Sequence, residues 1–289
     1  MILNKTKPFQ CMLAHPVGKK PTDWSDAYIQ PKLDGVRCYI TSTGAFSRNH
    51  KPFHNINHIL RELEHVFSKY PDIILDGELY NHKLKDNFNK IISLVRKQKP
   101  TFADMSEAQS LVQFHCYDMF NPKLPNDKYY QRASDIDSII DVYDLKYTKS
   151  VPFQAVLSLD AAKHNHQLNL NDGYEGSILR YNKPYEQKRS YNLQKFKDFH
   201  DTEATIVGWV EGQGKRIGTI GKFLAVDSNG VKFGMPVMGK QSMLEEMYDI
   251  AEWYIGKTAT FTYFQRTPSG SYRHPVSYTH LTLPTILLV

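Results

Sequence analysis

The positions of apolar side chains along the chain predict amphipathic helices and short strands in alternation. Ile56, Ile59, Leu60, Leu63 and Phe67 recur at helical spacing, which predicts a helix over about residues 56–70 with one buried face. The same spacing over residues 88–95 and 136–140 predicts two more helices. Strand-like runs lie at residues 28–32, 37–41, 45–48, 73–75, 112–118 and 177–180. This mixture of elements predicts an α+β fold.

The pattern changes at about residue 202. Short β runs follow at residues 204–210, 222–226, 231–233 and 258–264, and one helical stretch at 242–253 interrupts them. Glycines separate the runs, and several short strands with glycine turns predict a small barrel. We therefore expect one domain over residues 1–201 and a second over 202–276.

Composition and charge narrow the class of protein. The 289 residues are 41% hydrophobic and 23% charged, as in soluble globular proteins, and the net charge of +6 suits a polyanionic partner. We expect no membrane association and a cytoplasmic location, because no apolar run approaches the length of a membrane span and no secretory signal is evident. The three cysteines are scattered, which argues against a zinc site or a disulfide framework.

The first candidate for chemistry is the hexapeptide from Lys32 to Arg37, which reads K-x-D-G-x-R after a strand-like approach. An amine attacks phosphorus only when its surroundings activate it, and a strand end, a tight turn and a fixed cation could do so at Lys32. Asp-Gly is also a favoured hairpin dipeptide, so an ordinary turn explains this segment equally well when it is read alone.

Five further segments follow Lys32 in order, at residues 47–48, 76–79, 114–118, 172–176 and 194–197. Glu78 and Glu175 stand beside glycines, where a ligand can approach closely, and either carboxylate could bind a ribose hydroxyl or Mg²⁺. Tyr117 could stack on a purine or simply fill a core. Lys195 and Lys197 alternate on a strand, where they could neutralise a phosphate or form an ordinary solvated face.

Taken together, the order and spacing of these segments resemble the ATP-dependent DNA ligases, in particular the compact ligases of phages and some bacteria. The resemblance extends to about Val276 and places the chain among the covalent lysyl nucleotidyltransferases. It implies an α+β nucleotidyltransferase domain, ATP-grasp-like, with antiparallel sheets and flanking helices, followed by an OB-fold barrel. It also implies a monomer in the cytoplasm of a bacterial or phage-infected cell.

The resemblance also implies a reaction in three steps. Lys32 would attack the α-phosphate of ATP to give lysyl-AMP, AMP would pass to the 5′-phosphate of nicked duplex DNA, and the 3′-hydroxyl would displace it. Mg²⁺ would orient the phosphates. The remaining roles would be Gln30 on the adenine edge, Tyr117 on the adenine ring, Arg37 and Glu78 on the ribose, Arg48 on a phosphate, Glu78 and Glu175 on the metal, and Lys195 and Lys197 on the α-phosphate.

The C-terminal segment departs from this family. DNA ligases end in a basic motif, roughly R-x-D-K, whereas residues 277–289 contain no Asp, Glu, Lys or Arg. The segment resembles a translated sequencing adaptor. We therefore expect residues 277–289 to be a non-native tail, the OB-fold domain over 202–276 to be incomplete, and the first step of the reaction to be weak.

Two alternatives remain from the sequence. RNA ligases and mRNA-capping nucleotidyltransferases share the lysine motif, and they would differ in the nucleotide or the nucleic acid that they use. A non-enzymatic OB module that only binds nucleic acid is the other alternative, and it would bind DNA without ATP-dependent labelling of the chain.

Overall fold

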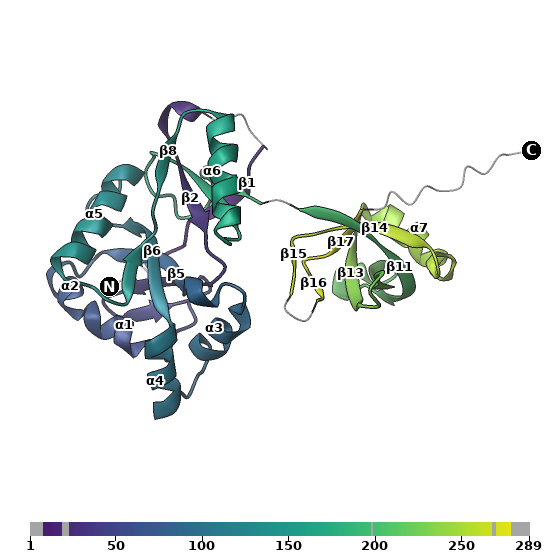
Figure 1. Cartoon of the computed structure of the whole chain (residues 1–289), viewed down its shortest axis with the longest axis horizontal. Helices are drawn as coiled ribbons and strands as arrows, with labels where there is room; N and C mark the ends of the chain where they lie inside the picture. The colour runs from purple at the N-terminus through teal and green to yellow at the C-terminus, as the bar shows by residue number, and fades with distance from the viewer. Residues whose placement is uncertain (1–7, 19–22, 198, 268–269, 279–289) are drawn as a thin grey trace, which may run out of the picture. The chain divides into compact units, whose positions relative to one another are not determined.

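The computed structural model describes residues 8–18, 23–197, 199–267 and 270–278, and the chain divides into two units (Figure 1). The first unit is Met1–Lys197 and the second is Asp198–Val289. This division falls slightly before residue 201, where the sequence places the boundary, because strand β11 (His200–Glu211) of the second unit begins earlier.

A five-stranded sheet carries much of the first unit, with the strand order β1-β10-β9-β2-β8. Its strands are β1 (Leu13–Pro16), β2 (Ala27–Lys32), β8 (Gln154–Val156), β9 (Gly176–Tyr181) and β10 (Arg189–Phe196). Neighbouring strands are antiparallel except for the parallel pair of β1 and β10. Helix α6 (Leu159–Asn171) lies beside this sheet (Figure 1) and packs against β2 and β9. The contact buries apolar residues that include Ile29, Ala162 and Leu179.

A second five-stranded sheet has the order β4-β3-β5-β6-β7. Its strands are β3 (Val36–Thr41), β4 (Gly44–Phe46), β5 (Ile74–Tyr80), β6 (Gln113–Phe120) and β7 (Thr148–Ser150). Five helices contribute to its core: α1 (Asn57–Glu62), α2 (Glu64–Lys69), α3 (Phe88–Val95), α4 (Phe102–Leu111) and α5 (Tyr129–Val142) (Figure 1). The apolar stripes predicted from the sequence face this core, where Ile59, Leu63, Ile91 and Ile136 are buried.

The helix predicted over residues 56–70 is in fact two short helices. Leu63 stands at the junction, as the C-cap of α1 and the N-cap of α2. Its side chain is buried, so the apolar pattern continues across the break and gives no sign of it. Helices α4 and α6 have no counterpart among the elements predicted from the sequence, since both are largely polar. A capping box between Thr101 and Asp104 marks the start of α4 and was the available signal.

The second unit contains a closed barrel with the strand order β11-β12-β13-β17-β14. After β11 come β12 (Ile220–Val226), β13 (Lys232–Met238), β14 (Thr258–Tyr263) and β17 (Val276–Tyr278), with α7 (Gln241–Asp249) between β13 and β14. Phe223, Met235 and Phe261 fill its interior. The architecture is the OB-like barrel that the sequence predicted.

Short elements complete the chain. They are the 3₁₀ turns Trp24–Asp26, His82–Leu84, Gly214–Arg216 and Ala251–Tyr254, and the strand pair β15 (Gln265–Arg266) and β16 (Tyr272–Arg273). Within the described residues, no helix is long and apolar enough to cross a membrane.

The segment expected to be a non-native tail is only partly described. Ser277 and Tyr278 belong to β17, which pairs with both β13 and β14, so the described barrel closes through residues that the sequence analysis assigned to the tail. Residues 279–289 lie outside the described part of the chain.

Gly77 provides a test of how tightly the second sheet is packed. A Cβ at Gly77 would lie 2.4 Å from the His115 carbonyl oxygen and 2.6 Å from the Phe114 ring. We therefore expect Gly77→Ala to lower the free energy of unfolding by about 1–3 kcal/mol, measured by urea denaturation. Gly208→Ala is the control, because its nearest neighbour is a Leu224 methyl carbon at 3.5 Å, and it should change stability by less than about 0.5 kcal/mol. Equal effects of the two substitutions would contradict this account.

Candidate active site

The candidate site lies where the two sheets of the first unit meet. Lys32 ends β2 in the first sheet, and the turn at residues 33–35 carries the chain directly to β3 in the second. A Cβ at Gly35 in this turn would lie 2.5 Å from the Leu79 carbonyl oxygen, so the turn packs against β5 as only a glycine allows. A cavity of about 140 Å³ opens beside Lys32.

Most of the residues predicted for the site come together around this cavity. Its lining includes Gln30, Lys32, Arg37, Glu78, Tyr117 and Lys195. Both sheets contribute, because Gln30, Lys32 and Lys195 lie on β2 and β10, whereas Arg37, Glu78 and Tyr117 lie on β3, β5 and β6.

Glu175 joins two of the predicted lysines. Its side chain is only 6% exposed, and its carboxylate forms ion pairs with the ammonium groups of both Lys32 and Lys197. The backbone N–H of Glu175 also donates a hydrogen bond to the carbonyl oxygen of Lys32 at 3.0 Å. Burial alone would raise the pKa of Glu175, but the two lysines outweigh it and lower that pKa. The carboxylate therefore stays ionised and fixes the position of the Lys32 amine.

The pKa of Glu78 is shifted in the opposite direction to that of Glu175. Burial raises the pKa of its carboxyl group to about 7, although Lys32 and Arg37 partly counteract the effect. The hydroxyl of Tyr117 donates a hydrogen bond to Glu78 Oε2 at 3.4 Å. The carboxyl group that lines the cavity, Glu78, thus titrates near neutral pH, whereas the Glu175 carboxylate that holds Lys32 remains charged.

Arg37 is engaged by a residue that the sequence analysis did not select. Its Nε and Nη2 donate to the two carboxylate oxygens of Asp76 at 2.9 and 2.5 Å, and Nη2 also donates to the Met12 carbonyl oxygen at 3.0 Å. The Tyr185 hydroxyl donates to the same Asp76 at 2.6 Å. Asp76 begins the D-G-E sequence that contains Glu78, and its position two residues before Glu78 could have marked it as a site residue. The buried ion pair holds Arg37 in the wall of the cavity.

Lys195 and Lys197 face different parts of the site. Lys195 lines the small cavity, whereas Lys197 contacts Glu175. Burial lowers the pKa of both lysines, and the neighbouring charge of Lys32 lowers it further. Partly buried ammonium groups interact strongly with a nearby anion because less water screens them.

Arg48 does not line the small cavity. It lies with Lys51 and Arg96 around a neighbouring cavity of about 650 Å³. Arg37 and Glu78 line both cavities, so the two spaces adjoin along a shared wall. Four basic side chains therefore surround the larger space, those of Arg37, Arg48, Lys51 and Arg96.

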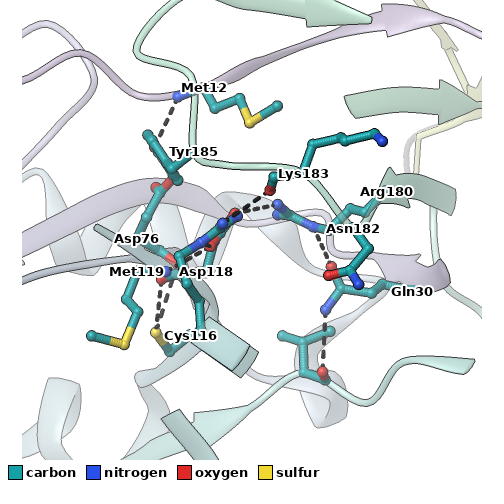
Figure 2. A network of polar contacts seen from close by, with 12 residues as sticks. Met12, Gln30, Asp76, Cys116, Asp118, Met119, Arg180, Asn182, Lys183 and Tyr185 are labelled. Atoms are coloured by element: carbon teal, nitrogen blue, oxygen red, sulfur yellow. Dashed lines mark hydrogen bonds and ion pairs between the residues drawn. The ribbon is translucent and has the colours of Figure 1, made fainter. Parts of the chain in front are cut away.

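Gln30 is part of a buried polar network (Figure 2). Gln30 is the one member of this network that was predicted as a site residue from the sequence. Arg180 donates from Nε to Gln30 Oε1 at 2.6 Å and from Nη1 to Asp118 at 2.6 Å. Arg132 binds the same Asp118 carboxylate through two nitrogens. These groups lie far apart in the sequence, and isolated charged residues of this kind usually lie in solvent.

A metal ion bound at this site would need ligands from the substrate in addition to those from the protein. Among the described residues, no three His, Cys, Asp or Glu side chains are grouped to hold a metal. Mg²⁺ commonly binds through one or two carboxylates together with substrate phosphates, and Glu78 and Glu175 fit that arrangement.

The raised pKa of Glu78 predicts how stability depends on pH. Between pH 4.5 and pH 7, folded Glu78 keeps a proton that the unfolded chain releases, so its contribution to the free energy of unfolding falls as pH rises. Glu78→Gln removes this titration. We expect wild type to lose on the order of 1 kcal/mol or more relative to Glu78→Gln across this window, measured by urea denaturation at several pH values. A stability difference that is constant with pH would contradict the assignment.

Comparisons with known proteins indicate the family of the chain. The family described as ATP dependent DNA ligase domain matches residues 11–197, about two thirds of the chain. No curated protein matches the sequence.

Solved structures extend the likeness of fold to both units. A Lig E DNA ligase covers 93% of this chain and 98% of its own, with 22% identity and a TM-score of 0.79. A Chlorella virus DNA ligase-adenylate covers 93% and 96%, with 22% identity and a TM-score of 0.52. The ATP-dependent DNA ligase of bacteriophage T7, in complex with ATP, covers 88% and 91%, with 17% identity and a TM-score of 0.50. With the family match over residues 11–197, the chain belongs to the ATP-dependent DNA ligases.

Proposed function

We propose that this ligase seals nicks in duplex DNA through a lysyl-AMP intermediate on Lys32. The observation that carries the proposal is the position of the Lys32 amine, which lines a cavity and is fixed there by Glu175. Lys197 binds the other oxygen of the same carboxylate, and Lys195 lines the same cavity. A nucleophilic amine among further cations is an arrangement suited to attack on a phosphate.

In the first step, the Lys32 amine attacks the α-phosphorus of ATP. A nitrogen–phosphorus bond forms, the bond from the α-phosphorus to the pyrophosphate oxygen breaks, and pyrophosphate leaves. The amine has to lose a proton, and the Glu175 carboxylate, to which it already donates a hydrogen bond, is positioned to accept it. Lys195 and Lys197 stabilise the negative charge that builds up on the phosphate oxygens.

Mg²⁺ would be held by Glu78, Glu175 and the phosphates of ATP. When bound, it would withdraw charge from the phosphate oxygens and make the phosphorus more reactive. The pKa of Glu78, about 7 without the metal, is compatible with this role. A bound cation would lower that pKa and so favour the ionised carboxylate that holds the metal.

The rest of the cavity suits a nucleoside. The Tyr117 ring lines it, with the guanidinium carbon of Arg37 5.1 Å and that of Arg180 5.2 Å from the ring centroid. We assign Tyr117 to the adenine ring, Gln30 to the adenine edge, and Arg37 and Glu78 to the ribose.

The larger cavity suits the DNA phosphate that receives AMP. We assign Arg48 to this phosphate, because it lines a basic space that adjoins the nucleotide cavity. AMP then passes from Lys32 to the 5′-phosphate of the nick. The 3′-hydroxyl attacks that phosphate, the new phosphodiester bond forms, and AMP leaves.

Labelling of the chain with α-labelled ATP and Mg²⁺ tests the first step. We expect covalent label on wild type and none on Lys32→Ala, read on a denaturing gel. Lys90→Ala is the matched control, since Lys90 pairs with Glu107 and lines neither cavity, and it should label as wild type does. Label that persists on Lys32→Ala would contradict the assignment of the nucleophile.

A second assay tests the choice of nucleic acid. A 5′-phosphorylated nick in duplex DNA should be sealed, and the same nick made entirely of RNA should be sealed far more slowly or not at all. Supplying a nick that already carries AMP bypasses Lys32, so Lys32→Ala should then seal it. Preferential sealing of RNA, or labelling by GTP in place of ATP, would instead favour an RNA ligase or a capping enzyme.

A further inference from the structure

The amide of Gln30 is held in one orientation. Its Nε2 donates a hydrogen bond to the Val151 carbonyl oxygen at 3.2 Å, and its Oε1 accepts one from Arg180 Nε at 2.6 Å (Figure 2). Rotating the amide by 180° would place its NH₂ group against the guanidinium and its oxygen against a carbonyl. The two contacts therefore decide which atom is oxygen and which is nitrogen.

Arg180 is itself fixed by a buried counter-charge. Its Nη1 donates to Asp118 Oδ2 at 2.6 Å, and Arg180 and Asp118 are 4% and 0% exposed. Arg132 binds Asp118 from the other side, at 2.7 and 3.1 Å, and is fixed by the carbonyl oxygens of Asp127 and Lys183. The guanidinium that contacts Gln30 therefore has little freedom to move.

One donor and one acceptor of the amide remain for a ligand. An amide oxygen accepts two hydrogen bonds and an amide nitrogen donates two, and the contacts above use one of each. Gln30 lines the cavity beside Lys32, so a base bound there lies against an amide whose donor and acceptor are in a fixed order.

A fixed order distinguishes 6-amino from 6-oxo purines. Adenine presents a donor at its 6-amino group and an acceptor at the adjacent ring nitrogen, a pattern that glutamine matches with two hydrogen bonds. Hypoxanthine and guanine carry an acceptor at position 6 instead. An amide that is free to rotate could adapt to either purine by exchanging its donor and acceptor, whereas a fixed amide cannot.

We propose that Arg180, anchored by Asp118, is a positioning residue that locks the Gln30 amide and so makes the nucleotide site select a 6-amino purine over a 6-oxo purine. This inference rests on the proposed function in placing the base of ATP in this cavity. Arg132 has a separate role, since it neutralises Asp118 without contacting Gln30 and so stabilises the fold.

Binding of ATP and inosine triphosphate, which differ at position 6 and in the protonation of N1, tests the proposal. Affinities are measured by calorimetry with Mg²⁺ in the Lys32→Ala background, where no covalent adduct forms. We expect Arg180→Met to reduce the preference for ATP over inosine triphosphate by about tenfold or more. Because both nucleotides are measured on one preparation, the fraction of folded protein cancels from the ratio.

Arg132→Met is the matched control. It removes a buried arginine from the same carboxylate but leaves the contact between Arg180 and Gln30, so the protein should be less stable and the preference should stay within about twofold of the parent. A parental preference in Arg180→Met, or an equal loss in Arg132→Met, would overturn the proposal.

Two further outcomes, an Arg180→Met variant that does not fold and a wild type that forms no adduct, each have a defined consequence. If Arg180→Met does not fold, Gln30→Met, which removes the amide without changing the charge, should show the same loss of preference, and retention would overturn the proposal. Complete failure of wild type to form even the weak Lys32 adduct expected without the C-terminal basic motif would contradict the proposed function, whereas the ratio of affinities in the Lys32→Ala background does not depend on that step.

Discussion

The first unit depends on how it accommodates the carboxylate of Asp118, which is fully buried. A charge removed from water costs several kcal/mol unless strong partners compensate for it. Here β6 brings Asp118 from the second sheet, β9 brings Arg180 from the first, and α5 brings Arg132. The carboxylate is therefore satisfied only when the two sheets and the helix come together. Removing one partner would leave a buried charge unpaired, so this contact constrains how the sheets meet.

The site follows from the same meeting of sheets. The chain passes from Lys32 in one sheet to Arg37 in the other through a turn at which Gly35 has no room for a side chain, so this turn brings the two side chains to the junction of the sheets. Asp76 then fixes Arg37 as Asp118 fixes Arg180. Arg37 and Arg180, each fixed by an aspartate, thus form a rigid part of the wall of the cavity, and a rigid wall suits the proposed binding of a ligand.

Much of the fold could be predicted because apolar periodicity reports which face of an element is buried. It located α3 and α5 and the strands β2, β3 and β9, but not α4 and α6, whose mostly polar surfaces have no comparable stripe. Lys32 could be selected from the K-x-D-G-x-R hexapeptide that it begins, and Glu78 and Glu175 because adjacent glycines mark places of close approach. Asp118, Arg132 and Arg180 could not, since their partners lie 14 and 62 residues away and nothing local distinguishes them from solvated charges.

The balance of charge beside Lys32 makes this cavity better suited to a polyanion than to a neutral molecule. Glu175 is one negative charge shared by two ammonium groups, so it neutralises only one of them. Lys195 adds a further positive charge, and the raised pKa of Glu78 means that its carboxyl group offsets little of this excess below about pH 7. Partial burial makes the excess more costly than it would be in water. In the proposed reaction, phosphate oxygens would relieve that cost at the position where the Lys32 amine is held, so the electrostatics that favour binding would also bring the reacting atoms together.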